Sequence, residues 1–236
     1  MASASTACSN WAVTLFFLPW AALGAVLGLA VNRLSLRLER AELSGMEAEM
    51  AEMGIVLRAR RWRDFFLPAA AALLFGLLAY KLGFGPVLGA ASVGTLILLQ
   101  ILVVDFEYRL ILAWVVLPAC VLALAVAILD PSALGVKDWK IDLLCGGLAT
   151  LFFAFLYYLP LWVMKKEALG FGDVQLGLFI GLFLNTAAAA AIIYGILGAG
   201  LISLVLLVLR IKKRGDYIPY GPFLCLGAIA ALLLRS

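Results

Sequence analysis

Long apolar runs follow one another along almost the whole chain. A helix needs about 20 apolar residues to cross the hydrocarbon core of a bilayer, and runs near this length alternate with polar segments. They cover residues 11–31, 65–80, 86–104, 110–129, 143–164, 174–183, 187–209 and 218–234. The sixth and seventh runs meet at Asn185 and Thr186, where we expect a tight turn on the outer side. The pattern predicts an all-α polytopic membrane protein with about eight transmembrane helices.

The composition supports this fold class and excludes catalytic sites that need histidine. Hydrophobic residues make up 66% of the chain and charged residues 14%, whereas soluble domains have about 45–50% and about 25%. We therefore expect membrane lipids around the chain and no nucleic acid partner. The chain contains no histidine, which excludes Ser-His-Asp, Cys-His and HExxH sites. Its 4 cysteines form no CxxC pair, so no local zinc site is expected.

The basic residues predict the orientation. With the N-terminus outside, most of the 18 Lys and Arg residues fall in inner segments, as the positive-inside rule requires. Residues 1–10 carry no Lys or Arg, which favours an uncleaved first span. The inner loop 33–64 carries Met46, Met50 and Met53 at helical spacing, which predicts an amphipathic helix. Its basic cluster, residues 58–63, is expected to meet the anionic leaflet.

Two aspartates stand at the inner ends of predicted spans, on the same side of the membrane. Asp105 directly follows an apolar run, and Asp173 ends the stretch Gly170-Phe171-Gly172-Asp173 directly before another run. Ionisable groups at such depth indicate function. Two aspartates that face each other hold one proton between them, so one can activate water while the other polarises a peptide carbonyl. Gly170 and Gly172 would let the backbone pass close to an extended peptide.

Both aspartates also fit roles that involve no peptide chemistry. Asp173 precedes an apolar helix, where Asp is a common N-cap residue. Asp105 could form an ion pair with Arg109 one helical turn later. Glu107 is a rival for Asp105, although two residues along a helix it would face elsewhere. A non-enzymatic transporter could use the pair as a proton relay, but a relay needs acidic groups near the midplane of the membrane.

Four stretches resemble motifs of the bacterial type IV prepilin peptidases, which are membrane aspartic proteases of the GxGD type. The matching stretches are residues 30–34, 105–110, 165–174 and 218–224, in the order of the family. Residues 105–110 resemble the segment of the family's first aspartate, and residues 165–174 resemble the signature around its second. Presenilin-type and signal-peptide-peptidase-type enzymes resemble the chain only in the GxGD, because their closing Pro-Ala-Leu motif is absent.

The resemblance implies an aspartic endopeptidase in the cytoplasmic membrane of a prokaryote. Such an enzyme removes the short basic leader from type IV prepilins, or from pseudopilins of type II secretion, at the cytosolic face. The implied site consists of Asp105 and Asp173 as the catalytic pair, Gly170, Phe171 and Gly172 as the active-site loop, and Pro219, Gly221 and Pro222 as support for the substrate site. We expect a single membrane-embedded domain, residues 1–236, with a cytosolic loop at 33–64 and catalytic helices at 105–236.

Some residues depart from the family pattern. Family members that also N-methylate their product with S-adenosylmethionine carry two zinc-binding CxxC pairs in a larger loop, whereas residues 33–64 contain no cysteine. The first-span pattern Gly-Ser-Phe-Leu-Asn is replaced by residues 24–28, Gly-Ala-Val-Leu-Gly. We therefore expect no zinc and no other cofactor, with S-adenosylmethionine needed only if methylation is retained. Leu112-Ala113 replaces the usual Pro-Asp, and Gln175 replaces a basic residue, but neither change removes an aspartate.

Overall fold

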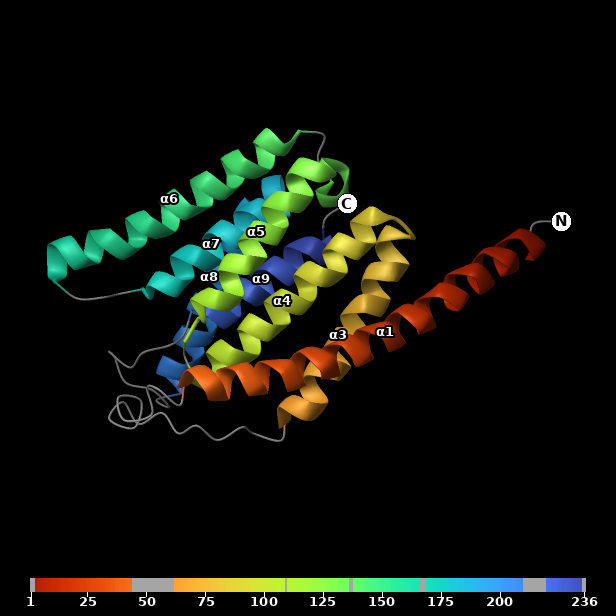
Figure 1. The fold of residues 1–236 in the computed structure, drawn as a ribbon, viewed down its shortest axis with the longest axis horizontal. Coiled ribbons are helices and arrows are strands. Elements are labelled where there is room, and N and C mark those ends of the chain that lie inside the picture. Colours follow the sequence, from red (N-terminus) through yellow and green to blue (C-terminus); the bar gives the residue numbers. More distant parts are fainter. Residues whose placement is uncertain are drawn as a thin grey trace. The chain divides into compact units, whose positions relative to one another are not determined.

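Helices make up all of the regular secondary structure that the computed structural model describes (Figure 1). The described residues are 3–43, 62–108, 110–135, 138–165, 169–209 and 220–234. Within them, the stretches long and apolar enough to cross a membrane are Phe17–Arg37, Trp62–Leu82, Pro86–Tyr108, Trp139–Val163 and Phe171–Val208. Ala113–Leu129 and Gly221–Leu234 are shorter apolar helices.

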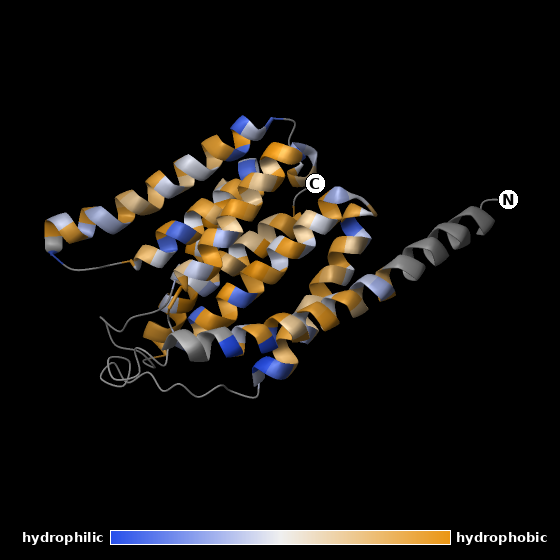
Figure 2. Ribbon diagram, viewed as in Figure 1, coloured by the Kyte–Doolittle hydropathy of each residue, from blue (hydrophilic) through white to orange (hydrophobic). Residues whose placement is uncertain are grey.

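Hydrophobic residues run along the length of these helices (Figure 2). The chain is therefore a multi-pass, all-α membrane protein, and this predicted fold class is confirmed. The count of eight crossings and the outside N-terminus stay predictions.

The chain divides into two units, Met1–Gln100 and Ile101–Ser236. The first unit contains α1 (Ser3–Leu43), α3 (Trp62–Leu82) and the first part of α4 (Pro86–Tyr108). Helices α1 and α3 approach closely at Gly24 and Gly28. A Cβ atom on Gly24 would lie 2.7 Å from the carbonyl oxygen of Ala71, and one on Gly28 would lie 3.0 Å from the Cα atom of Pro68. Small residues four apart allow such close packing of membrane helices.

Buried polar side chains connect the helices of the first unit. Asn32 Nδ2 donates a hydrogen bond to Asp64 Oδ1 at 2.8 Å. The hydroxyl oxygen of Ser35 accepts from Arg63 Nη2 at 3.3 Å and from Gln100 Nε2. Arg63 is fully buried, so it does not face the anionic leaflet as the basic cluster was expected to do. Its guanidinium has an acceptor inside the protein instead. The predicted amphipathic helix around Met46–Met53 lies outside the described residues.

The second unit is built around one short helix, α7 (Phe171–Leu184). It contacts α5 (Ala113–Leu129), α6 (Trp139–Met164), α8 (Ala188–Val208) and α9 (Gly221–Leu234). Its 14 residues span about 21 Å, less than the roughly 30 Å of a hydrocarbon core. Because protein surrounds α7, its ends can lie inside the bundle without exposing backbone groups to lipid. In its first turn Asp173 and Val174 are buried, whereas Phe171, the first residue of the helix, is exposed.

Helices α7 and α8 are separated by a short 3₁₀ turn, η2 (Asn185–Ala187). Asn185 adopts a positive φ of 44°, a conformation that Asn tolerates better than most residues. Its side chain holds the turn, since Nδ2 donates to the carbonyl oxygen of Leu134 at 2.9 Å and Oδ1 accepts from the Thr186 N–H at 2.7 Å. Two helices with a tight turn between them were predicted here, and the structure confirms them.

Candidate active site

Asp105 and Asp173 line one small cavity in the second unit. The cavity has a volume of about 160 Å³, and its other lining residues are Leu110, Ile111, Gly170, Phe171 and Gly172. Asp105 is 4% exposed and Asp173 is 3% exposed. Their carboxyl groups are close enough to interact electrostatically. The structure therefore brings together two aspartates from α4 and α7 that lie far apart in the sequence. Gly170, Phe171 and Gly172 line the same cavity, but they are not the predicted loop, because Phe171 and Gly172 form the beginning of α7 and Gly170 is its N-cap residue.

Asp173 is held by the backbone at the beginning of α7. The Gly170 N–H donates to Asp173 Oδ2 at 3.2 Å, and the Asp173 N–H donates to the Gly170 carbonyl oxygen at 3.0 Å. Gly170 is the N-cap residue, so Asp173 caps the helix from its first turn and is not itself the N-cap. The positive end of the helix dipole favours a carboxylate here. Its Oδ1 atom has no hydrogen-bond partner among the described residues.

Asp105 lies in the last turn of α4, and its carboxyl group faces the beginning of α9. Its Oδ2 atom is buried, and no described residue donates a hydrogen bond to it. Gly221, the first residue of α9, packs directly against this carboxyl group. Cys225, fully buried one turn later on α9, is close enough to interact electrostatically with both aspartates. The positive end of α7 thus lies at Asp173, and the positive end of α9 lies against Asp105, opposite to the negative end of α4 on which Asp105 itself is placed.

Close packing around Ile111 explains the glycine next to Asp173. A Cβ atom on Gly172 would lie 2.6 Å from Ile111 Cβ, and the Cδ1 atom of Ile111 reaches toward Gly221. Ile111 thus lies between two glycines that border the aspartates. Glu107, the rival of Asp105, is not among the lining residues of the cavity. Arg109, considered as a partner of Asp105, lies outside the described residues.

The comparison with known families assigns the chain to a peptidase family. The model of the type IV leader peptidase family matches residues 92–209, half of the chain. The chain belongs to the type IV leader peptidase family. Both aspartates fall inside the match, whereas Gly221 and Pro222 lie beyond its end. The roles assigned to individual residues stay predictions.

Curated relatives carry the same family name. Over 174 residues the chain is 28% identical to the prepilin leader peptidase/N-methyltransferase of Stutzerimonas stutzeri and 29% identical to that of Pseudomonas aeruginosa. Each match covers 70% of this chain and 56% of the relative. The chain thus matches little more than half the length of these relatives. No solved structure matches the chain.

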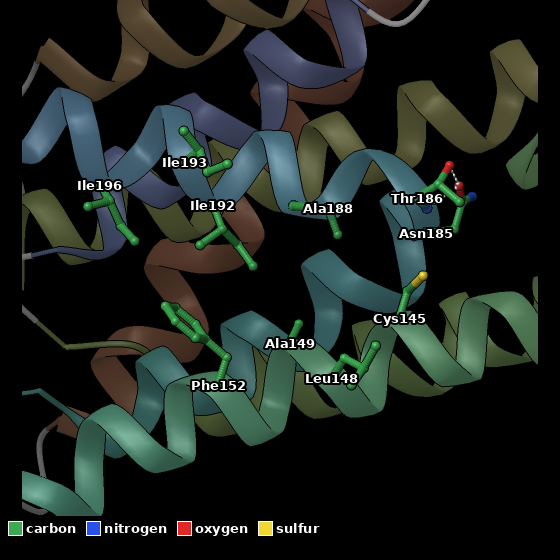
Figure 3. A pocket seen from close by; sticks show the side chains of 11 residues that line it. Cys145, Leu148, Ala149, Phe152, Asn185, Thr186, Ala188, Ile192, Ile193 and Ile196 are labelled. Atoms are coloured by element: carbon green, nitrogen blue, oxygen red, sulfur yellow. Dashed lines mark hydrogen bonds between the residues drawn. The ribbon is translucent and has the colours of Figure 1, made fainter.

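A second, larger cavity lies between α6 and α8 of this leader peptidase family member (Figure 3). It has a volume of about 340 Å³, and aliphatic and aromatic side chains line most of it. Its polar residues, Asn185 and Thr186, gather at one end together with Cys145. Because no carboxylate is among its lining residues, it offers no acid or base pair for hydrolysis. The acidic cavity is therefore the candidate active site.

The sequence pattern did not identify Ile111 as a site residue or place Cys225 beside the aspartates. Ile111 lies in an apolar run, where nothing distinguishes it from residues that face lipid. Cys225 lies in another such run, far along the chain. The three residues predicted to support the substrate site have different outcomes. Gly221 contacts Asp105, and Pro222 is buried in the first turn of α9. Pro219 lies outside the described residues.

The described part of the chain contains no group of three or more Cys, Asp or Glu side chains that could hold a metal ion. The acidic cavity offers two carboxylates without a third ligand. Independence from zinc stays a prediction for the whole chain, because residues 44–61 of the inner loop lie outside the described residues.

Proposed function

We propose that this chain is an intramembrane aspartic endopeptidase that removes the short basic leader from type IV prepilins or pseudopilins. The observation that carries the proposal is the burial of Asp105 and Asp173 around one cavity. Membership of the leader peptidase family supports a peptidase, and the names of the relatives suggest the substrate. The distribution of Lys and Arg favours a reaction at the cytosolic face of a prokaryotic cytoplasmic membrane.

The proposed reaction uses the two carboxyl groups as acid and base. Two carboxyl groups in a small desolvated cavity hold one proton between them. The ionised carboxylate takes a proton from a water molecule, whose oxygen attacks the scissile carbonyl carbon. The protonated carboxyl donates a hydrogen bond to the carbonyl oxygen and stabilises the negative charge of the tetrahedral intermediate. The intermediate then loses the amine as the C–N bond breaks, and the proton taken from water passes to that amine.

We further propose that the chain cleaves without transferring a methyl group. The relatives are named as both peptidase and N-methyltransferase. Residues 33–64 contain none of the cysteines that the resemblance associates with zinc in bifunctional members. No step of the proposed cleavage involves S-adenosylmethionine.

The test is an assay of the full chain, purified in detergent, on a synthetic prepilin-like peptide. With and without S-adenosylmethionine, product masses should show removal of the leader and no added methyl group. Asp105→Asn and Asp173→Asn should each lower kcat at least ~100-fold, because each removes a group that takes part in proton transfer. Asp130→Asn is a matched control, since Asp130 is exposed and does not line the cavity.

Each part of the proposal can fail separately. Normal cleavage by both Asp105→Asn and Asp173→Asn would refute the aspartic mechanism. A product that gains the mass of a methyl group would refute the proposal of cleavage alone, while leaving the peptidase assignment intact.

A further inference from the structure

The bare Cα atom of Gly221 lies against the carboxyl group of Asp105. A Cβ atom at this position would overlap with Asp105 Oδ2, lie 3.0 Å from Asp105 Cγ and lie 3.1 Å from Ile111 Cδ1. Both Gly221 and Asp105 are buried. The beginning of α9 therefore forms one wall of the space in which the Asp105 carboxyl group rests.

The Asp105 carboxyl group needs such a wall more than the Asp173 carboxyl group does. A hydrogen bond from the Gly170 N–H fixes Asp173, whereas no described residue donates to Asp105 Oδ2. The final torsion of an Asp side chain has a broad energy profile, so packing has to define its orientation. Oδ2 is buried and lies against Gly221, so the packing of α9 limits how far the carboxyl group can turn.

We propose that Gly221 is a positioning residue, whose missing side chain sets the orientation of the Asp105 carboxyl group in the active site. This inference rests on the proposed function, because it concerns one of the two carboxyl groups of the proposed peptidase. Gly221 does not line the cavity itself, so it acts through Asp105 and not through contact with the substrate. The positive end of α9 also lies beside Oδ2, where it favours the negative charge of the pair.

An alanine at position 221 should disturb the carboxyl group more than the fold. The atoms closest to the added methyl group are Oδ2 and Cγ of Asp105 and Cδ1 of Ile111, which belong to side chains that can rotate and not to the backbone. The methyl group can therefore be accommodated if the Asp105 carboxyl turns out of its position. The reacting oxygen is then misplaced while the helices stay where they are.

The primary experiment measures kcat and KM of Gly221→Ala on the leader peptide, together with its thermal unfolding midpoint. We expect kcat to fall about 100-fold, since a misplacement of about 1 Å can cost this much, with KM and the midpoint close to those of the parent. Gly147→Ala on α6 is the matched control, because Gly147 is exposed and an added Cβ meets nothing within 4 Å. An unchanged kcat in a folded Gly221→Ala protein would overturn the proposal.

A second variant separates the two contacts of the added methyl group. Ile111→Val removes the Cδ1 atom that lies 3.1 Å away, but leaves Asp105 in place. If the methyl group acts on Asp105, the double variant Gly221→Ala/Ile111→Val stays far less active than Ile111→Val alone. Recovery to the level of Ile111→Val would assign the effect to Ile111 and overturn the proposal.

A stability cycle keeps the proposal testable if Gly221→Ala folds poorly. Asp105→Ala removes the obstructing carboxyl group, so adding Gly221→Ala to it should lower the midpoint less than adding it to the parent. An equal effect in both backgrounds would mean that the obstacle lies elsewhere. Failure of the proposed function gives a different result, because Asp105→Asn and Asp173→Asn would then remain active. If these two are inactive and Gly221→Ala is fully active, only the positioning role is wrong.

Discussion

Replacing Gly172 by alanine tests how closely the beginning of α7 packs beside Asp173. The added Cβ atom would lie 2.6 Å from Ile111 Cβ, 3.2 Å from Ile111 Cγ2 and 3.3 Å from the Ile111 carbonyl oxygen. Carbon atoms in ordinary contact are about 3.5–4.0 Å apart. Since Ile111 Cβ is bonded directly to the backbone, it cannot rotate away as the ends of side chains can. The two segments must therefore separate by about 1 Å to reach an ordinary contact distance.

Two opposing effects determine the stability of Gly172→Ala. Overpacking of a filled interior costs about 1–3 kcal/mol, and replacing a helical glycine by alanine gains up to about 1 kcal/mol. The sum is a destabilisation of about 0–3 kcal/mol, which we expect to leave the protein folded. The displacement acts on the next residue, Asp173, and a shift of about 1 Å at a reacting group can cost about 100-fold in rate. Activity should thus fall far more than stability.

The assay compares kcat/KM on the leader peptide with the free energy of unfolding in detergent. Gly147→Ala is again the control, because its added methyl group meets nothing within 4 Å; it should gain up to about 1 kcal/mol and keep full activity. Ile111→Val should not rescue Gly172→Ala, since valine retains both the Cβ and a Cγ2 atom. The reasoning is refuted if Gly172→Ala keeps full activity and gains as much stability as Gly147→Ala.

Two further predictions concern the fold and are read from unfolding midpoints. Asn185→Ala should destabilise the protein by about 2–3 kcal/mol, because it removes the hydrogen bond from Asn185 Nδ2 to the Leu134 carbonyl oxygen and puts a less tolerant residue at a positive φ. Asn185→Gly should cost less, since glycine accepts that φ, and equal costs would contradict the turn geometry. Trp20→Phe removes the hydrogen bond from Nε1 to Ser92 Oγ at 3.0 Å but keeps a ring against Phe84, and should cost about 0.6 kcal/mol. Ser92→Ala should cost the same, and additive losses in the double variant would contradict a direct bond.

The helices could be predicted from the sequence because the length of an apolar run is a local property that lipid imposes. Their ends could not be predicted as well. Helix α4 continues beyond its apolar run, through Asp105 to Tyr108, and α1 continues to Leu43. A helix continues as long as its backbone hydrogen bonds are favourable, whether or not the side chains face lipid. Asp105 therefore projects from a rigid helix and not from the loop that follows it.

The pairing of the two aspartates could also be predicted, because the directions predicted for the spans place both aspartates on one side of the membrane. The contacts around them could not be predicted, since they join residues far apart in the chain. Arg63 shows the same limit. Its place in a basic segment predicts an exposed side chain, yet the structure buries it with a hydrogen bond to Ser35. A cluster of basic residues in the sequence indicates a segment near the membrane surface. Whether one of these side chains is buried depends on which helix packs against it, and the cluster does not contain that information.

The short helix α7 explains how a chain without histidine can keep two acidic groups inside a membrane protein. Among the described residues, no Lys or Arg lines the cavity, and Gln175 stands where the resemblance expects a basic residue. Backbone N–H groups at the beginnings of two helices supply partial positive charge in place of a basic side chain. Helix α7 begins with its positive end at the buried Asp173, and α9 begins with its positive end against Asp105. A longer α7 would carry its first turn past the cavity, and a side chain at position 221 would turn the Asp105 carboxyl group out of its position. The length of α7 and the glycine at the beginning of α9 thus determine where the two carboxyl groups can carry negative charge.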